Sequence, residues 1–323
     1  MEFRHVRTFV TVVDQRGFAS AAHALYCSQP TISSHVAELE RELGTPLFAR
    51  DRRPVELTQA GEAFLGHART LLREIEAAHH TVSGIVGLTR GTVRLGTYPS
   101  ATVGFVPGVV QAFTAAHPGI QVSLVESGGA QLPDMALDHE VDLFLRQTVP
   151  PLDDSAFACD VLWREDFMVV AHPDHPLARE ETAVPADRLL EHALVVTGQF
   201  DPDSLMAHPF WASLPRRPSF AFQVAQPQSL LALVAANMGV GVTTELALRV
   251  SRAEGLVIRR VASPLAVREV ALYSPRRRSP SPAAAALTAF IRDPGRLPPG
   301  CRAPATDPRP ATPAAGPGSA VTV

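Results

Sequence analysis

The chain contains 323 residues with a formal net charge of −3, and 46% of them are hydrophobic. This length allows two or more domains with buried cores. The small negative charge argues against polyanion binding by the surface as a whole, but it does not exclude a local basic patch. No run approaches eighteen consecutive apolar residues, so no membrane span is expected. The N-terminal stretch MEFRHVRTFV lacks the apolar core of a signal peptide, which favours the cytoplasm.

The cysteines and basic residues narrow the kinds of binding site that the chain is expected to contain. Cys27, Cys159 and Cys301 lie far apart and no CxxC pair occurs, so neither a disulfide framework nor a zinc site is expected. Nothing in the sequence points to a cofactor. All 29 basic residues are arginine. A coding bias explains this most simply, but each cation is then a planar group suited to phosphates and guanine edges.

Residues 1–57 are predicted to form short helices joined by tight turns. The first helix, roughly 3–14, is expected to bury apolar residues at helical spacing, namely Phe3, Val6, Phe9, Val10 and Val13. Gly17 ends it, a second helix covers 18–25, and a third runs from about Ser28 to Leu43, where Gly44 stops it. Pro54 and the alternating Val55 and Leu57 indicate a small β-wing.

The third helix is expected to have two chemically different faces. At 100° per residue, Ile32, Val36, Leu39 and Leu43 fall on one side and are predicted to pack on the first two helices. Ser28 is placed to cap the first turn, where Pro30 is tolerated. Small polar side chains occupy the exposed N-terminal turns, which are the turns that enter a major groove in a helix–turn–helix. The candidate DNA contacts are Ser28, Gln29, Pro30, Thr31, Ser33 and Ser34.

A DNA-binding helix–turn–helix is therefore predicted, with a generic helical packing domain as the alternative. Arg50, Arg52 and Arg53 on the wing would hold phosphates or reach a minor groove of double-stranded DNA. Residues 1–57 contain seven arginines and seven acidic residues, a net charge of zero. Affinity would then depend on the placement of these charges and on the presence of two or more copies of the domain.

Residues 58–88 contain no proline and carry a coiled-coil pattern. The apolar seam is Phe64, Ala68, Leu71, Ile75, Ala78, Val82 and Ile85, with alternating spacings of four and three residues. A helix of this length forms a rod of roughly 45 Å. We expect its seam to meet a second copy of the chain, with packing inside one chain as the alternative.

From residue 91 onward, short apolar strands alternate with helices, which predicts an α/β fold with a mostly parallel sheet. The expected strands include 120–126, 141–145, 167–172, 193–196 and 267–274. The last thirty residues hold eight prolines and no apolar period. We therefore predict a disordered tail over 294–323.

Together these segments resemble the LysR-type transcriptional regulators. The resemblance rests on AAxxL, SQPxxSxxxxxLExxLGxxLFxR and LTxAG in the first 61 residues, and more weakly on LGTYPS, AAHPGI, AHPDHPLA and LVAANMGVGV, over about 1–291. It implies a winged helix–turn–helix over 1–58, a dimerising linker helix over 59–90 and an effector-binding domain over 91–293. That domain would resemble type 2 periplasmic binding proteins, with lobe one at 91–161 and 266–293 and lobe two at 162–265.

The resemblance also implies a function and partners. Such a protein binds promoter DNA as a homodimer or homotetramer, is not an enzyme, and responds to a small molecule in the cleft between its lobes; RNA polymerase is a further candidate partner. Ser100 matches the family's Ser or Thr in the turn TYPSAT, whose hydroxyls and backbone N–H groups could seat an anion. The other candidate effector-binding residues are Thr97, Thr102, Arg146, Thr197, Gln199 and Gln226. If Arg146 faces the cleft, an anionic effector is favoured.

The sequence also allows two alternative interpretations. The stretch HPDH (172–175) could hold a metal, although an exposed loop after a strand is the simpler interpretation, and no metal site is predicted. Residues 91–291 alone could belong to a solute-binding protein of the periplasmic type. The absence of a signal peptide and the fused DNA-binding segment argue against that alternative.

Overall fold

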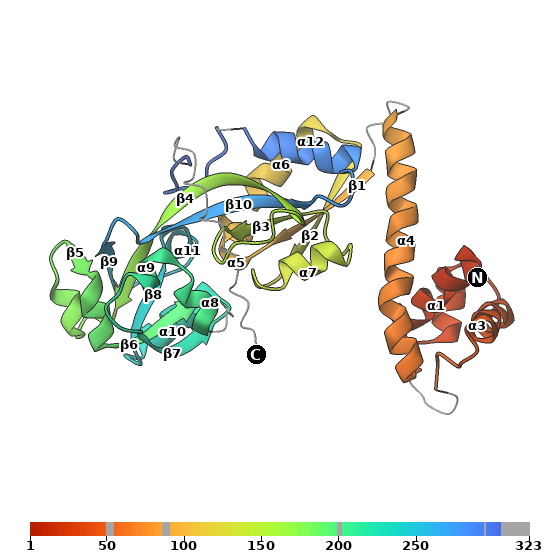
Figure 1. Ribbon diagram of the computed structural model, residues 1–323, viewed down its shortest axis with the longest axis horizontal. Helices are drawn as coiled ribbons and strands as arrows, with labels where there is room; N and C mark the ends of the chain where they lie inside the picture. Colours follow the sequence, from red (N-terminus) through yellow and green to blue (C-terminus); the bar gives the residue numbers. More distant parts are fainter. Residues whose placement is uncertain (50–54, 86–90, 199–201, 294, 305–323) are drawn as a thin grey trace, which may run out of the picture.

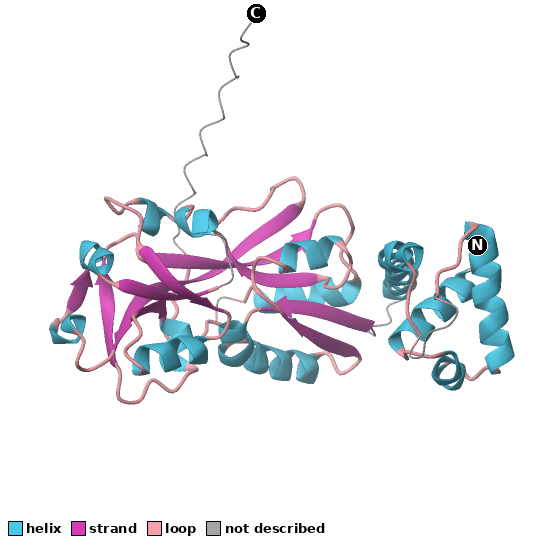
Figure 2. Cartoon of the chain, turned by 90° about the horizontal axis from the view of Figure 1, so that it is seen from below, coloured by secondary structure: helices cyan, strands magenta, loops and turns pink. Residues whose placement is uncertain are grey.

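The computed structural model describes residues 1–49, 55–85, 91–198, 202–293 and 295–304. Figure 1 shows three parts in chain order: a small N-terminal helical domain, a single long helix, and a larger α/β domain. Figure 2 gives the same division from below, with the helical domain separate from the body that contains the sheet. No helix in the described part is both long and apolar enough to cross a membrane.

The helical domain follows the prediction closely. Its helices are α1 (Phe3–Asp14), α2 (Phe18–Ala24) and α3 (Gln29–Leu43). The side chain of Ser28 caps α3 by accepting from the Thr31 backbone N–H at 3.3 Å, and Gly44 ends the helix at φ +71°. An antiparallel bridge between Phe48 and Leu57 forms the base of the predicted wing.

Several expected core positions differ from the prediction. Leu43 is 40% exposed and Phe3 is 44% exposed, whereas His5 and Thr8 are buried. His35 of α3 accounts for the burial of these two polar residues, because its Nδ1 lies 3.0 Å from the Thr8 hydroxyl and its ring lies 5.1 Å from that of His5. The face of α1 that packs on α3 therefore includes the polar residues His5 and Thr8, and Phe3 lies outside this face.

The wing is tied to the helices by residues of the LExxLG and LTxAG motifs. Glu40 Oε1 accepts from the backbone N–H groups of Leu47 and Phe48 at 2.7 and 3.2 Å. The Thr58 hydroxyl donates to the Pro46 carbonyl at 2.7 Å. A Cβ on Gly61 would collide with the Leu47 carbonyl, so only glycine allows this close approach.

The long helix α4 (Gln59–Ile85) begins in the helical domain and continues beyond it. Ala68 is fully buried and Phe64 packs on the Phe9 ring at 5.3 Å, so the first part of the predicted seam lies inside the chain's own core. Leu71 is 41% exposed and Ala78 is also exposed. The side chains of Val82 and Ile85 lie outside the described set. Among the described seam residues, Phe64 and Ala68 thus pack inside the chain, whereas Leu71 and Ala78 are exposed and Ile75 is half-buried.

The α/β domain contains ten strands and a set of short helices. The strands are β1 (Gly91–Thr97), β2 (Ile120–Glu126), β3 (Leu143–Gln147), β4 (Phe157–Ala171), β5 (Ala183–Pro185), β6 (Ala193–Thr197), β7 (Ser219–Val224), β8 (Val240–Thr244), β9 (Val257–Ala262) and β10 (Val267–Pro275). The helices are α5 (Pro99–Gly104), α6 (Val106–Ala116), α7 (Leu132–Leu137), η1 (Pro176–Arg179), η2 (Ala186–Glu191), α8 (Pro202–Met206), α9 (Pro209–Ala212), α10 (Pro227–Ala235), α11 (Glu245–Arg249) and α12 (Pro282–Ile291).

Two half-sheets share the long strand β4. The order is β2-β1-β3-β10-β4-β8-β6-β7, with β9 paired to β4 and β5. Pairs β1/β2, β1/β3, β6/β7 and β6/β8 are parallel, whereas β10 and β4 are antiparallel to their neighbours. The first part of β4, residues 157–166, pairs with β10, and the last part, 167–171, pairs with β8 and β9. Figure 1 shows β4 and β10 running together between the two halves.

Each half has its own apolar core, and α11 packs on clusters from both halves. Trp163, Phe113 and Leu95 are buried in one core, and Phe210 and Val240 in the other. Leu246 of α11 belongs to the first core, although the predicted lobe two contains it. Leu248, two residues later, belongs to a cluster beneath α10. The lobe boundaries stay a prediction, but α11 links the two halves by packing.

The predicted disordered tail differs from the structure at its start. Residues 295–304 are ordered, because Arg302 makes an antiparallel bridge with Arg164 of β4. The sequence has no apolar periodicity here. The segment is held instead by backbone pairing and ion pairs, which a hydrophobic pattern does not reveal. Residues 305–323 lie outside the described residues.

Candidate functional site

The first candidate site is the exposed surface at the start of α3. Ser28, Gln29, Pro30, Ser33 and Ser34 are all exposed, while Ile32 between them is fully buried. The Ser28 and Thr31 hydroxyl oxygens lie 2.8 Å apart, so these two hydroxyls satisfy each other and help to shape the helix start. Gln29 and Ser33 have no such role in the described structure and present their side chains to solvent. The wing arginines Arg50, Arg52 and Arg53 lie outside the described residues.

Sequence reasoning missed one prominent residue beside this surface. Tyr26 is 97% exposed and adopts a positive φ of 53° in the turn between α2 and α3. Its side chain lies in solvent beside the exposed start of α3 and packs on no core of the described residues. The signal in the sequence was a tyrosine in a short turn, where a small polar residue is usual.

The second candidate site is a pocket of about 180 Å³ in the α/β domain. It lies where strands of the two half-sheets end. Tyr98 and Ser100 follow β1, Glu126 ends β2 and is followed by Ser127 to Gly129, and Arg146 and Gln147 end β3; in the other half, Thr197 ends β6, Gly198 follows it, and Ala225 to Pro227 follow β7. Ala247 of α11 and Arg268 of β10 complete the wall. Ligands in open α/β folds bind outside the carboxyl ends of strands, so this is the expected place for one.

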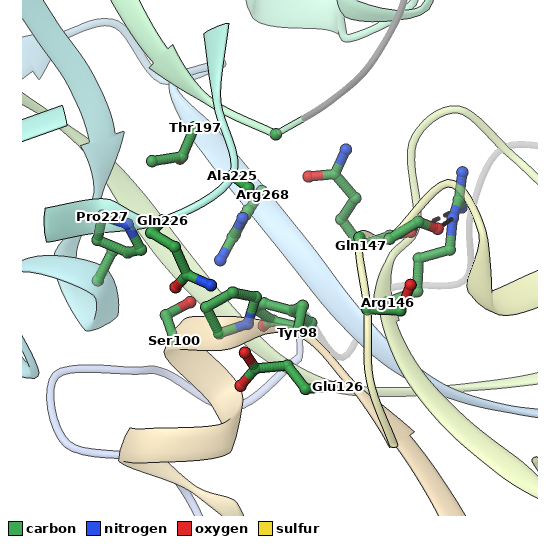
Figure 3. Close-up of a pocket in the computed structure, with 16 residues that line it drawn as sticks. Tyr98, Ser100, Glu126, Arg146, Gln147, Thr197, Ala225, Gln226, Pro227 and Arg268 are labelled. Carbon is green, nitrogen blue, oxygen red and sulfur yellow. Dashed lines mark hydrogen bonds between the residues drawn. The ribbon is translucent and has the colours of Figure 1, made fainter. Parts of the chain in front are cut away.

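Four of the predicted effector-binding residues meet at this pocket. They are Ser100, Arg146, Thr197 and Gln226. Thr97 is fully buried and accepts a hydrogen bond from Thr102, and neither of them lines the pocket. Gln199 lies outside the described residues. The chain thus brings Ser100 of one half close to Thr197 and Gln226 of the other (Figure 3).

Arg146 borders the pocket, but its guanidinium is occupied by the protein. Its Nε donates to the Gly129 carbonyl at 2.9 Å, and its Nη1 donates to the carbonyls of Gln147 and Pro150 at 2.9 and 2.8 Å. Burial lowers its pKa. Figure 3 shows the Arg146 side chain beside the end of β3, directed away from Ser100 and Gln226. Arg146 therefore fixes the loops that form one wall of the pocket.

Arg268 is the cation that points into the pocket. Figure 3 shows its side chain directed toward the space between Thr197, Gln226 and Ser100. Its Nε donates to Glu165 Oε1 at 2.8 Å, and its guanidinium carbon lies 5.2 Å from the centre of the Tyr98 ring. Only 13% of the Arg268 side chain is exposed, and Glu165 is fully buried.

The Arg268–Glu165 ion pair is buried beside the Tyr98 ring. Burial lowers the pKa of Arg268, but the charge of Glu165, the hydrogen bond to it and the neighbouring Tyr98 together outweigh burial, so the net shift is upward and the guanidinium stays charged. Burial also raises the pKa of the Tyr98 hydroxyl. Within the described structure, neither that hydroxyl nor Glu165 Oε2 has a hydrogen-bond partner. Sequence reasoning missed Arg268 because a single arginine in an apolar strand carries no spacing motif.

A smaller cavity adjoins the pocket and shares Gln147, Thr197 and Arg268 with it. His208 and Trp211 are among its lining residues. Burial lowers the pKa of His208 to about 4. Its Nδ1 accepts from the Phe210 backbone N–H at 3.2 Å and so caps α9.

Comparisons with known proteins agree with this arrangement. Residues 3–62 match the model of the bacterial regulatory helix-turn-helix protein, lysR family, and residues 87–295 match the LysR substrate binding domain. The chain is 29% identical over 245 residues to the transcriptional regulator AlsR of Bacillus subtilis, covering 74% of this chain and 79% of that protein. It is 36% identical over 181 residues to the Hca operon transcriptional activator HcaR of Escherichia coli, covering 56% and 60%.

Solved structures show the same fold over the full length. A full-length OxyR from Pseudomonas aeruginosa superposes with a TM-score of 0.68 at 21% identity, covering 96% of this chain and 99% of that one. Full-length CbnR in complex with its target DNA gives a TM-score of 0.66 at 22% identity, covering 90% and 99%. With both family models matched in order across the helical and α/β domains, the chain belongs to the LysR family of DNA-binding transcriptional regulators and is not an enzyme.

Proposed function

We propose that this regulator binds promoter DNA through the N-terminal turns of α3 and is controlled by a small anionic metabolite in the pocket between the two halves of its α/β domain. The first part rests on an exposed, uncharged helix start that stands on a rigid core. The second part rests on one observation, the charged guanidinium of Arg268 at the centre of the pocket wall.

The DNA-binding surface fits a major groove by shape and hydrogen bonding. Gln29 and Ser33 are exposed on one side of α3, and both are able to donate to and accept from base edges. Glu40 holds the wing next to this helix, so Arg50, Arg52 and Arg53 would follow the same stretch of duplex. Phosphate contacts from the wing position the protein, and the helix contacts supply specificity.

Two copies of this surface are needed for appreciable affinity, because residues 1–57 carry no net charge. The exposed residues of the α4 seam, including Leu71 and Ala78, offer the contact for a homodimer, and a homotetramer could form from two such dimers. RNA polymerase is a further candidate partner at the promoter. We place the protein in the cytoplasm, where promoter DNA is found.

The pocket is suited to a carboxylate. Ser100 and Gln226 provide uncharged donors from opposite halves, and Arg268 provides a planar cation with its Nη atoms on the pocket side. Glu165 fixes Arg268 through Nε alone, so the guanidinium is oriented before the ligand arrives. A ligand that contacts both halves would favour one arrangement of the two lobes, which is how binding could be transmitted to the DNA-binding domains.

Thermal unfolding of the full-length protein tests the ligand class. Benzoate, succinate and 3-hydroxybutyrate are each compared with the corresponding neutral amide at millimolar concentration. At least one acid is expected to raise the melting temperature while its amide does not. Ser100→Ala should reduce the apparent affinity for that acid roughly tenfold, the effect of one lost hydrogen bond to a charge. Equal effects of acids and amides, or no effect of any acid, would contradict an anionic effector.

Promoter binding is tested separately by footprinting on the DNA upstream of the protein's own gene at moderate salt. A protected region that is lost with competitor of the same sequence, but not with unrelated DNA, is the expected result. Protection that does not depend on sequence would overturn the assignment of α3 as a recognition helix.

A further inference from the structure

The chain continues past the LysR substrate binding domain, which matches up to residue 295, and the next nine residues are ordered against the rest of the protein. The Arg164 backbone N–H donates to the Arg302 carbonyl at 2.8 Å, and the Arg302 N–H donates to the Arg164 carbonyl at 2.9 Å. The Arg302 guanidinium also pairs with Asp166. Residues 296–304 are here called the strap. The strap therefore adds backbone pairing to β4 close to residue 166, where β4 passes from one half-sheet to the other.

The strap also contacts α11. Gly300 adopts a φ of +79°, and a Cβ at this position would collide with the side chains of Glu245 and Arg249. At its beginning, the strap is anchored by Arg296, whose guanidinium carbon lies 3.6 Å from the centre of the Phe290 ring of α12. The strap therefore touches α12, α11 and β4 within nine residues.

These contact points are those that connect the two halves of the domain. β4 pairs with β10 on one side of residue 166 and with β8 and β9 on the other. α11 places Leu246 in one core and Leu248 beside the other. Asp166, which pairs with Arg302 of the strap, also pairs with Arg260 of β9 at 2.7 Å. A segment fixed to both β4 and α11 restrains how the halves move relative to each other.

The strap also lies beside the ion pair that borders the pocket. Cys301 packs against the core that contains Trp163, and it precedes Arg302, which pairs with Arg164 next to Glu165. Burial is the main reason that the pKa of Cys301 is raised to about 12, so it acts here as a small apolar side chain and not as a reactive thiol. The strap thus meets β4 directly beside Glu165, the carboxylate that holds Arg268.

We propose that residues 296–304 form an intrachain strap that holds α11 against β4, and so sets both the relative position of the two halves and the position of the Glu165–Arg268 pair that borders the pocket. The strap is a part of the chain's own C-terminal segment, and its release would loosen the crossover without unfolding either half. This inference concerns the mechanics of the domain and does not depend on the identity of the effector.

The two tryptophans of the chain provide local reporters. Trp163 of β4 lies next to the strap in one core, and Trp211 lies in the other. The test compares full-length protein with a chain ending at Pro304 and a chain ending at Gly295, each carrying either Trp211→Phe or Trp163→Phe. Ending at Gly295 should increase acrylamide quenching of Trp163 at least twofold and leave Trp211 unchanged, since only one core loses its cover. Ending at Pro304 should change neither.

A pair of glycine variants repeats the test without truncation. Gly300→Ala and Gly255→Ala both place a side chain at a positive φ, +79° and +76°, but a Cβ at Gly255 meets nothing within 4 Å. Because the atoms near Gly300 are the ends of flexible side chains, Gly300→Ala should increase hydrogen exchange of the β4 and α11 amides less than ending the chain at Gly295 does, whereas Gly255→Ala should leave it unchanged. The proposal would be overturned if the chain ending at Gly295 and Gly300→Ala both left Trp163 quenching and hydrogen exchange unchanged. It would also be overturned by equal changes at Trp163 and Trp211, because these indicate general destabilisation.

Discussion

The two candidate sites of this protein are built in opposite ways. The proposed DNA-binding surface comes from one continuous stretch, Ser28 to Ser34, whose candidate contact residues are uncharged and mostly exposed. The proposed effector pocket takes its lining from seven separate segments, and its main charge belongs to a buried ion pair between strands β4 and β10. Substitutions on the helix surface should therefore change binding without changing stability, whereas substitutions in the pocket should change both.

The largest expected effect is on the buried ion pair. Arg268→Met leaves the Glu165 carboxylate fully buried without its partner, which typically costs about 3–5 kcal/mol of stability. Arg260→Met is the matched control: Arg260 pairs with Asp166 of the same strand but is 60% exposed, so its loss should cost at most about 1 kcal/mol. Urea unfolding monitored by tryptophan fluorescence measures both. Equal losses would mean that the pair at the pocket is solvated like a surface pair.

The helical domain should respond to core substitution independently of the pocket. Leu39→Ala in α3 removes a fully buried side chain and should destabilise this domain by about 2–5 kcal/mol. Leu43→Ala on the same helix, where the side chain is 40% exposed, should cost less than about 1 kcal/mol. Calorimetry of the full chain is expected to show the low-temperature transition shifting while the α/β domain keeps its transition. A shift of both transitions would show that the two regions unfold together.

Acidification should weaken the α/β domain through His208. Its pKa is about 4 in the folded protein against an ordinary value of 6.5, so between these values the unfolded chain binds more protons. Stability therefore falls as the pH is lowered from 6.5 towards 4, by up to roughly 3 kcal/mol, and this contribution levels off below pH 4. His208→Asn retains an N-cap acceptor for α9 and should remove this part of the pH dependence. A pH profile that His208→Asn leaves unchanged would assign the dependence to other groups.

The smallest effect on stability, and a clear effect on binding, is expected at the helix start. Gln29→Ala and Tyr26→Ala should each weaken binding to the footprinted DNA roughly tenfold, the size of one lost base or backbone contact. Their stability should change by less than about 0.5 kcal/mol, because both side chains are exposed. Gln111→Ala, at an exposed glutamine of α6, is the control and should alter neither quantity.

Much of the helical domain could be predicted because its signals are local. Ser28 as N-cap, Gly44 as the helix stop and Ile32, Val36 and Leu39 as the core face all follow from spacing and backbone chemistry. The prediction was wrong for Leu43 and Phe3, since periodicity gives a face but not the depth of the neighbouring helix. The coiled-coil seam of α4 is real as a pattern, but the fold uses Phe64 and Ala68 for its own core.

The pocket could be predicted only in part. Ser100, Thr197 and Gln226 lie where strand ends were expected, and strand ends converge in any fold of this kind. Arg146 lines the pocket as expected, but its guanidinium donates to three backbone carbonyls, which the sequence does not reveal. Arg268 was not singled out, because its role depends on Glu165, a hundred residues earlier in the chain, lying beside it.

The sequence by itself determined the local chemistry: the helix caps, the polar start of α3, the glycine of LTxAG and the family to which the chain belongs. The tertiary structure alone decided which arginine faces the pocket, which seam residues of α4 stay exposed, and that residues 295–304 pair with β4. The physical reason is the range of the interactions. Capping and helical periodicity act within a few residues, whereas the burial of Arg268 and the pairing of Arg302 with Arg164 depend on strands that meet only when the whole domain has folded.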